Sequence, residues 1–177
     1  MTQETILLVE DTYGVDFHRT IIEKLRENNQ LSQTKIRVER LPAKKYNPAI
    51  IRKILAKTID KKKTRIIIII DTENRDPKTA IEKDIKQHLE NHFKNKTKPR
   101  NLEIHITTVH PYHEAWLCIG LGANKQKCRK NLIQQIETLL NTKYEKHMLT
   151  TQAKHIDINK LKEEKDFKQY LKLLNAR

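Results

Sequence analysis

The chain has 177 residues, with 36 Lys or Arg against 22 Asp or Glu, which gives a formal net charge of +14. This length suits one α/β domain with a buried core. No run of about 18 apolar residues occurs that would span a membrane, and Glu10 and Asp11 interrupt the first apolar run before it resembles a signal peptide. We therefore expect a soluble, cytoplasmic protein without a membrane span. The positive charge predicts a polyanion, DNA or RNA, as its main partner.

Four apolar segments predict β-strands. Residues 5–9 and 65–70 contain continuous apolar runs, with ILLV after Thr5 and five successive isoleucines after Arg65. Residues 34–41 and 102–109 alternate between apolar and polar side chains. Continuous runs suit strands that are buried on both faces, and alternating ones suit strands nearer the edge of a sheet.

Apolar residues at helical spacing fill the intervals between these strands. Pro48 and Pro77 mark the starts of two of the helices, where proline is tolerated. A short helix is expected over residues 113–119, with Gly120 and Gly122 at its end, and further helices follow it. The fold class is therefore α/β, with a mainly parallel four-stranded sheet flanked by helices and with C-terminal helices. We predict a core over residues 1–122 and a helical extension over 123–177 packed on that core.

Two acids directly follow the continuous apolar strands. Glu10 comes after the first and Asp71 after the third. Ligands of open parallel sheets bind beyond the carboxyl ends of the strands, and two carboxylates placed there repel one another unless a cation lies between them. Mg²⁺ or Mn²⁺ suits such oxygen ligands. The alternative is that both acids merely end their strands and face solvent.

A third acid, Glu114, lies just past the fourth strand in the first turn of a predicted helix. The same edge of the sheet can therefore present it. Trp116 is expected to pack so as to fix that turn. Asp11 and Asp76 are weaker candidates, because Asp11 points away from Glu10 if the strand continues and Asp76 before a proline is typical of a helix N-cap.

The histidines give little sign of a zinc site, since no HExxH pattern occurs. His110 and His113 are three residues apart and could reach one metal, but we favour a solvated or substrate-facing role for both. His18, His88 and His92 lie on amphipathic segments and are expected at the surface or at its boundary.

The two cysteines, Cys118 and Cys128, are ten residues apart and have no CxxC partner. This spacing is not that of a zinc site. We expect a reduced pair, in keeping with the predicted cytoplasmic location.

The sequence resembles two known folds. Residues 6–11 read ILLVED, as in receiver domains of two-component signalling, where acids after the first strand hold magnesium beside a phosphorylated aspartate. Asp71 would be that aspartate, but it lies much farther from Glu10 than a compact receiver needs, so a receiver-like phospho-acceptor is the lesser alternative.

The stronger resemblance is to the Toprim fold of topoisomerases, primases and small nucleases. Leu8-Val9-Glu10 resembles its first motif, and Asp71-Thr72-Glu73 resembles its Asp-x-Asp, with glutamate as the last acid. The segment from Glu10 through Asp16 to His18 looks like a lengthened Glu-Gly-x-x-Asp turn. His113-Glu114-Ala115-Trp116-Leu117 resembles a segment of small stand-alone Toprim-like families. The resemblance covers about residues 4–122.

This resemblance implies a metal-dependent nuclease or a related phosphoryl-transfer enzyme. Asp71, with Glu73 or Glu114, would hold Mg²⁺ or Mn²⁺, and Glu10 would coordinate metal or move a proton. Basic clusters would guide the nucleic-acid backbone; they comprise Lys44, Lys45, Lys61, Lys62, Lys63, Lys125, Lys127, Arg129 and Lys130. The alternatives are a non-catalytic module that binds nucleic acid or a partner on a degenerate Toprim fold, and an effector subunit that is silent until a partner activates it. A homo-oligomer is also left open.

Overall fold

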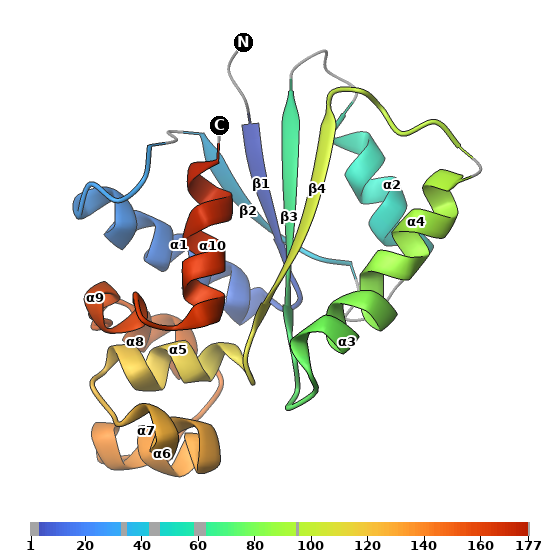
Figure 1. Cartoon of the computed structure of the whole chain (residues 1–177). Helices are drawn as coiled ribbons and strands as arrows, with labels where there is room; N and C mark the ends of the chain where they lie inside the picture. The colour runs from blue at the N-terminus through green and yellow to red at the C-terminus, as the bar shows by residue number, and fades with distance from the viewer. Residues whose placement is uncertain (1–3, 33–34, 43–46, 59–62, 95, 177) are drawn as a thin grey trace.

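The computed structural model describes residues 4–32, 35–42, 47–58, 63–94 and 96–176 (Figure 1). Its centre is a four-stranded sheet of β1 (Glu4–Val9), β2 (Ile36–Arg40), β3 (Thr64–Asp71) and β4 (Leu102–Val109). The strand order is β2-β1-β3-β4, and each neighbouring pair is parallel. The α/β fold with a parallel four-stranded sheet, flanking helices and C-terminal helices is thus confirmed.

The arrangement of the strands follows their apolar patterns. β1 and β3, which carry the continuous apolar runs, are the two central strands, and the alternating β2 and β4 are the edges. Every residue of β3 is buried, from Thr64 to Asp71. A strand covered by helices on both faces needs apolar side chains on both, which is why its isoleucines are continuous.

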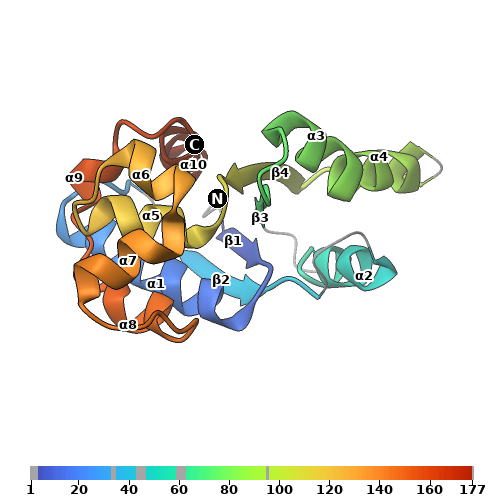
Figure 2. The ribbon, with the colours of Figure 1, turned by 90° about the horizontal axis from the view of Figure 1, so that it is seen from below.

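Helices cover both faces of the sheet (Figure 2). Three elements lie on one face: α2 (Pro48–Ala56), α3 (Pro77–Ile81), which continues through the π-turn η1 (Glu82–Lys86), and α4 (Gln87–Lys94). The other helices lie on the opposite face or beyond the carboxyl ends of the strands; they are α1 (Thr12–Glu27), α5 (His113–Gly120), α6 (Lys125–Lys130), α7 (Leu132–Leu140), α8 (Met148–Ala153), α9 (Ile158–Leu161) and α10 (Lys165–Asn175).

Two separate apolar cores result. The core beneath α2, α3 and α4 consists of aliphatic side chains such as Ile68 and Ile54. The core on the other face also contains aromatic residues, among them Trp116 and Phe167. This second core joins strand residues to residues of α8, α9 and α10, so the C-terminal helices share one apolar interior with the sheet. In the part of the chain that the structure describes, no helix is long and apolar enough to cross a membrane.

Two predictions about individual side chains were wrong. His18, expected at the surface or its boundary, is buried, and His113, expected to be solvated or to face a substrate, is buried as well, because the C-terminal helices cover the face on which they lie. Cys118 and Cys128 form a disulfide, with a Cα–Cα distance of 5.9 Å, and not a reduced pair. The turn between α5 and α6 folds the nine intervening residues back, so that the two cysteines meet within the core.

Candidate functional site

The carboxyl ends of β1 and β3 form the switch point of the sheet. β1 has β2 on one side and β3 on the other, so the chain leaves β1 toward one edge and later returns to its other side. Ligands of open parallel sheets bind at this point. Glu10 follows β1 directly, and Asp71 is the last residue of β3. Both side chains are largely buried, with 9% of each residue exposed.

Strand alternation directs these two acids to opposite faces. Val9 and Ile69 belong to the core beneath α1, whereas Leu8 belongs to the core beneath α2. Successive side chains alternate along a strand. Glu10 therefore points to the same face as Leu8, toward α2, and Asp71 points to the same face as Ile69, toward α1. In agreement, the charge of Glu10 contributes to the raised pKa of Arg75, which Asp84 raises most through hydrogen bonds at 2.7 and 2.8 Å.

Glu73, the second acid of the predicted Asp-x-Glu motif, is turned away from Asp71. Its φ of 52° lies in the left-handed region, as does that of Asn74, and its N–H donates to the carbonyl of Pro111 at 3.0 Å. Its carboxylate is more than a third exposed and lies 3.8 Å from Arg75. The tight turn after β3 therefore directs the Glu73 carboxylate toward Arg75 and away from Asp71.

Asp11, the weaker candidate in the sequence, joins Asp71 instead. It is the N-cap of α1, and its Oδ1 accepts the N–H of Gly14 at 2.5 Å. A side chain at Gly14 would collide with Val9, since an added Cβ would lie 2.7 Å from its Cγ1. This glycine lets α1 start close against β1, which holds Asp11 at the carboxyl edge on the α1 side.

Lys146 lies among the acids of this side. Its Nζ donates to Glu114 Oε1 at 2.6 Å and lies 3.7 Å from Asp11 Oδ2. Burial lowers the pKa of Lys146, but the charges of Glu114, Asp11 and Asp71 outweigh burial and raise it. The hydroxyl of Tyr144 also donates to Glu114 Oε1, at 3.1 Å. An ammonium group thus balances three carboxylates. We call Asp11, Asp71, Glu114 and Lys146 the carboxylate cluster.

One buried oxygen of this cluster, Glu114 Oε2, lacks a hydrogen-bond partner within the described structure. Asp71 Oδ1 is satisfied by the imidazole of His113, whose Nδ1 lies 2.6 Å away. Buried oxygens without partners carry a desolvation cost that a ligand can remove. Within the described ranges, no group of three or more Asp, Glu, His or Cys side chains is arranged closely enough to enclose a metal ion.

A buried chain of polar side chains leads from Asp71 into the C-terminal helices. His113 Nε2 lies 2.8 Å from His18 Nε2, and His18 Nδ1 lies 3.1 Å from the hydroxyl of Tyr170. Burial lowers the pKa of His113, but the Asp71 carboxylate outweighs it and raises that pKa. Burial, with the charge of His113, holds the pKa of His18 well below its ordinary value. His18 is therefore the neutral member of the pair.

The short helix α5 supplies both His113 and Glu114, and its start is fixed from α10. Asp166 Oδ2 accepts the N–H of His110 at 2.9 Å and Nε1–H of Trp116 at 3.1 Å. Trp116 is buried, as expected, with its ring against Phe167. The C-terminal helices thus position the side chains that approach Asp71.

The basic residues predicted to guide nucleic acid are divided over the molecule. Lys44, Lys45, Lys61 and Lys62 lie outside the described residues. Lys63 precedes β3, at the opposite end of the sheet from the carboxylate cluster, and pairs with Glu103 at 2.8 Å. The four residues of α6 lie beyond the carboxyl ends, where Lys125 and Arg129 both pair with Glu164 and where Lys127 and Lys130 are exposed.

Sequence reasoning missed Lys146, Tyr144 and Tyr170 as parts of the site. Lys146 and Tyr144 lie between α7 and α8, where apolar periodicity lapses, and Tyr170 has the spacing of an ordinary core residue. No local motif marks them, because they reach the site through the folding of distant helices. Asp76 is the N-cap of α3, as predicted, and its Oδ2 accepts the N–H of Thr79 at 2.9 Å.

Comparisons with known proteins identify no relative: neither a protein-family model, nor a curated protein, nor a solved structure matches this chain. The resemblance to Toprim proteins accordingly rests on the sequence motifs alone and stays a prediction.

Proposed function

We propose that the chain is a nucleic-acid phosphodiesterase that uses Mg²⁺ or Mn²⁺ held by Asp11, Asp71 and Glu114. The observation that carries this proposal is a buried oxygen of Glu114 that has no hydrogen-bond partner in the described structure, in a cluster with the largely buried carboxylate of Asp71. These three carboxylates lie near the switch point of a parallel sheet and offer only oxygen donors, which hard divalent cations prefer. Because they do not enclose an ion as they stand around Lys146, they would have to draw together to hold one. The net charge of +14 supports a polyanionic substrate.

The divalent ion, when bound, would activate a water molecule and offset charge on the scissile phosphate. Lys146 supplies the positive charge among these acids, and with an ion held there its ammonium group would be available to contact the substrate phosphate. His113 holds the Asp71 carboxylate in place from within the core. Glu10 continues the opposite face of the sheet from these acids, so we assign it no part in holding the ion.

A second candidate is a module that binds nucleic acid without cutting it. The ion pair between Lys146 and Glu114 favours this alternative, because it already neutralises one of the three acids. The two candidates share the nucleic-acid partner and differ in whether divalent ions reach Asp71.

A cleavage assay distinguishes them. Labelled single- and double-stranded DNA and RNA are incubated with Mn²⁺ and with the unaltered protein, an Asp71→Asn variant or an Asp16→Asn control. Asp16 is an exposed acid of α1 that pairs with Arg19. We expect the unaltered protein and the control to cleave at least one substrate, and Asp71→Asn to lose at least about a hundredfold in rate. Equal cleavage by all three proteins would contradict the assigned site. Binding without cleavage by any of them would establish the second candidate.

A further inference from the structure

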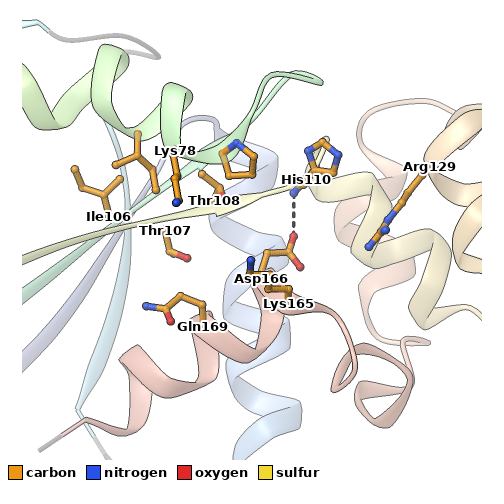
Figure 3. A pocket seen from close by; sticks show the side chains of 11 residues that line it. Lys78, Ile106, Thr107, Thr108, His110, Arg129, Lys165, Asp166 and Gln169 are labelled. Atoms are coloured by element: carbon orange, nitrogen blue, oxygen red, sulfur yellow. Dashed lines mark hydrogen bonds between the residues drawn. The ribbon is translucent and has the colours of Figure 1, made fainter.

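A cleft of about 490 Å³ lies along the outer edge of β4, away from the carboxylate cluster (Figure 3). Residues of α3 line one side of it and residues of α10 line the other, so the cleft lies between the two helical layers of the molecule. This volume falls within the range of about 300–1,000 Å³ that is typical of sites for small organic ligands.

The backbone of β4 offers hydrogen-bonding groups to this cleft. Among the described strands, β4 pairs with β3 alone. The N–H of Thr72 donates to the carbonyl of Val109, so the odd-numbered residues of β4 face β3. Alternate residues of a parallel strand face opposite ways. The N–H and C=O groups of Ile106 and Thr108, both of which line the cleft, therefore face outward.

Cationic side chains reach the cleft from three separate helices. They are Lys78 of α3, Arg129 of α6 and Lys165 of α10 (Figure 3). Arg129 is paired with Glu164, whereas Lys78 and Lys165 form no ion pair with any described residue. Asp166 is the one acid of the lining, and it is engaged with the backbone N–H of His110 and with Trp116. The lining therefore has an excess of positive charge that is available to an anion.

The remaining lining is mixed in character. Ile81 and Ile106 provide an apolar wall, and Gln169 provides an amide that can both donate and accept hydrogen bonds. Cations, an apolar wall and exposed backbone amides together suit a ligand that has a phosphate group and a flat heterocycle with polar edges. A nucleotide meets these requirements.

One residue of the cleft, His110, contacts the chain just after the carboxyl end of β3. His110 lines the cleft, and its Nδ1 lies 2.7 Å from Oγ1 of Thr72, the residue after Asp71. A ligand in the cleft would thus lie across the carboxyl ends of β3 and β4 from the cluster.

We propose that the cleft at the β4 edge binds one phosphorylated nucleotide, with Lys78 and Lys165 as the residues that contact its phosphate. The cleft accommodates a single nucleotide and not a duplex, and the same chemistry is offered by a free nucleoside monophosphate or by the phosphorylated end of a strand. The choice of a nucleotide rests on the proposed function, but the binding itself requires no divalent ion and no cleavage.

The test measures binding in the presence of EDTA, so that it is independent of catalysis. The probes are thymidine 5′-monophosphate, pentathymidylate with a 5′-phosphate and pentathymidylate with a 5′-hydroxyl. Affinity is measured by calorimetry, and the site is located from the backbone amide resonances of Ile106, Thr108 and Gln169. The test variant is Lys78→Ala with Lys165→Ala. The control, Lys83→Ala with Lys172→Ala, removes the same charge from exposed residues of the same two layers, outside the cleft.

We expect a phosphorylated probe to shift these resonances and the test variant to weaken its binding at least about tenfold, with the control unchanged. Binding of the mononucleotide would identify a free nucleotide as sufficient, and binding of the phosphorylated pentamer alone would identify a strand end. Equal binding of phosphorylated and hydroxyl pentamers, equal losses in the two double variants, or no shift at Ile106 and Thr108 would each overturn the proposal. Because both variants change only exposed lysines, their melting temperatures should equal that of the unaltered protein. A protein that fails the cleavage assay can still pass this test.

Discussion

The two faces of the sheet are filled with different kinds of side chain. The buried apolar side chains beneath α2, α3 and α4 are all aliphatic, as with Ile68 and Leu8. Beneath α1, α5 and α10 the interior also holds His18, His113 and Tyr170. An aliphatic layer can stabilise a fold without specifying the position of any polar group, whereas a buried polar chain must be satisfied in one arrangement. The first face thus supports the sheet, and the second also positions Asp71.

The largest effect on stability is expected on the aliphatic face. Ile68→Ala removes a fully buried side chain from the centre of β3 and should lower the free energy of unfolding by about 2–5 kcal/mol, because the cavity cannot close. Urea unfolding measures this loss. Below the unfolding transition, the amide resonances of His113 and Glu114 on the other face should stay unchanged. A loss under about 1 kcal/mol would show that this face does not carry the stability assigned to it.

On the polar face, a substitution that removes much less side-chain volume should still lower the free energy of unfolding. Tyr170→Phe removes one oxygen and leaves His18 Nδ1 without the partner that it has at 3.1 Å. We expect a loss of about 1–3 kcal/mol, the usual cost of one unsatisfied buried polar group. Urea unfolding measures it, with Tyr13→Phe as the control, since Tyr13 is an exposed tyrosine. Equal stabilities of the two variants would contradict the proposed role of the buried chain.

The smallest effect concerns pH. The pKa of His113 is raised, so its contribution to stability is complete below about pH 6.5, the ordinary value, and is lost as pH rises through the folded pKa. The pKa of His18 is lowered, so the folded state loses stability as pH falls below about 6.5. This pair therefore favours maximum stability near pH 6.5. Urea unfolding between pH 5 and 8 tests this, together with the ring resonances of both residues. A ring of His18 that takes up its proton at higher pH than that of His113 would contradict the assignment.

The sequence was sufficient to predict the sheet. The continuous isoleucines predicted a central position for β3, and the alternating pattern predicted an edge position for β4. Both predictions were possible because the apolar pattern of a strand depends directly on whether one or both of its faces are buried. The cleft at that edge was not foreseen, since it depends on how far α3 and α10 stand apart on either side of β4.

The carboxylate cluster was predicted only in part. Asp71 ends β3 and Glu114 comes shortly after β4, so their location at the carboxyl edge follows from topology. Asp11 belongs to the cluster and Glu73 does not, because Asp11 is the N-cap of α1 and because the backbone turns through the left-handed region at Glu73. The apolar pattern does not reveal the backbone dihedral angles of individual residues. Lys146 reaches the cluster from a segment between helices, and neither its charge nor its spacing distinguishes it from other lysines.

The central claim, that a divalent ion binds among Asp11, Asp71 and Glu114, is tested most directly by the line broadening that Mn²⁺ causes in the amide resonances of the protein. Substoichiometric Mn²⁺ should broaden first the resonances of these three residues and of Lys146, and Asp71→Asn should abolish this pattern while Asp16→Asn leaves it intact. Broadening that is centred elsewhere, for example on Glu39 or Glu103, or that is equal in the two variants, would contradict the claim.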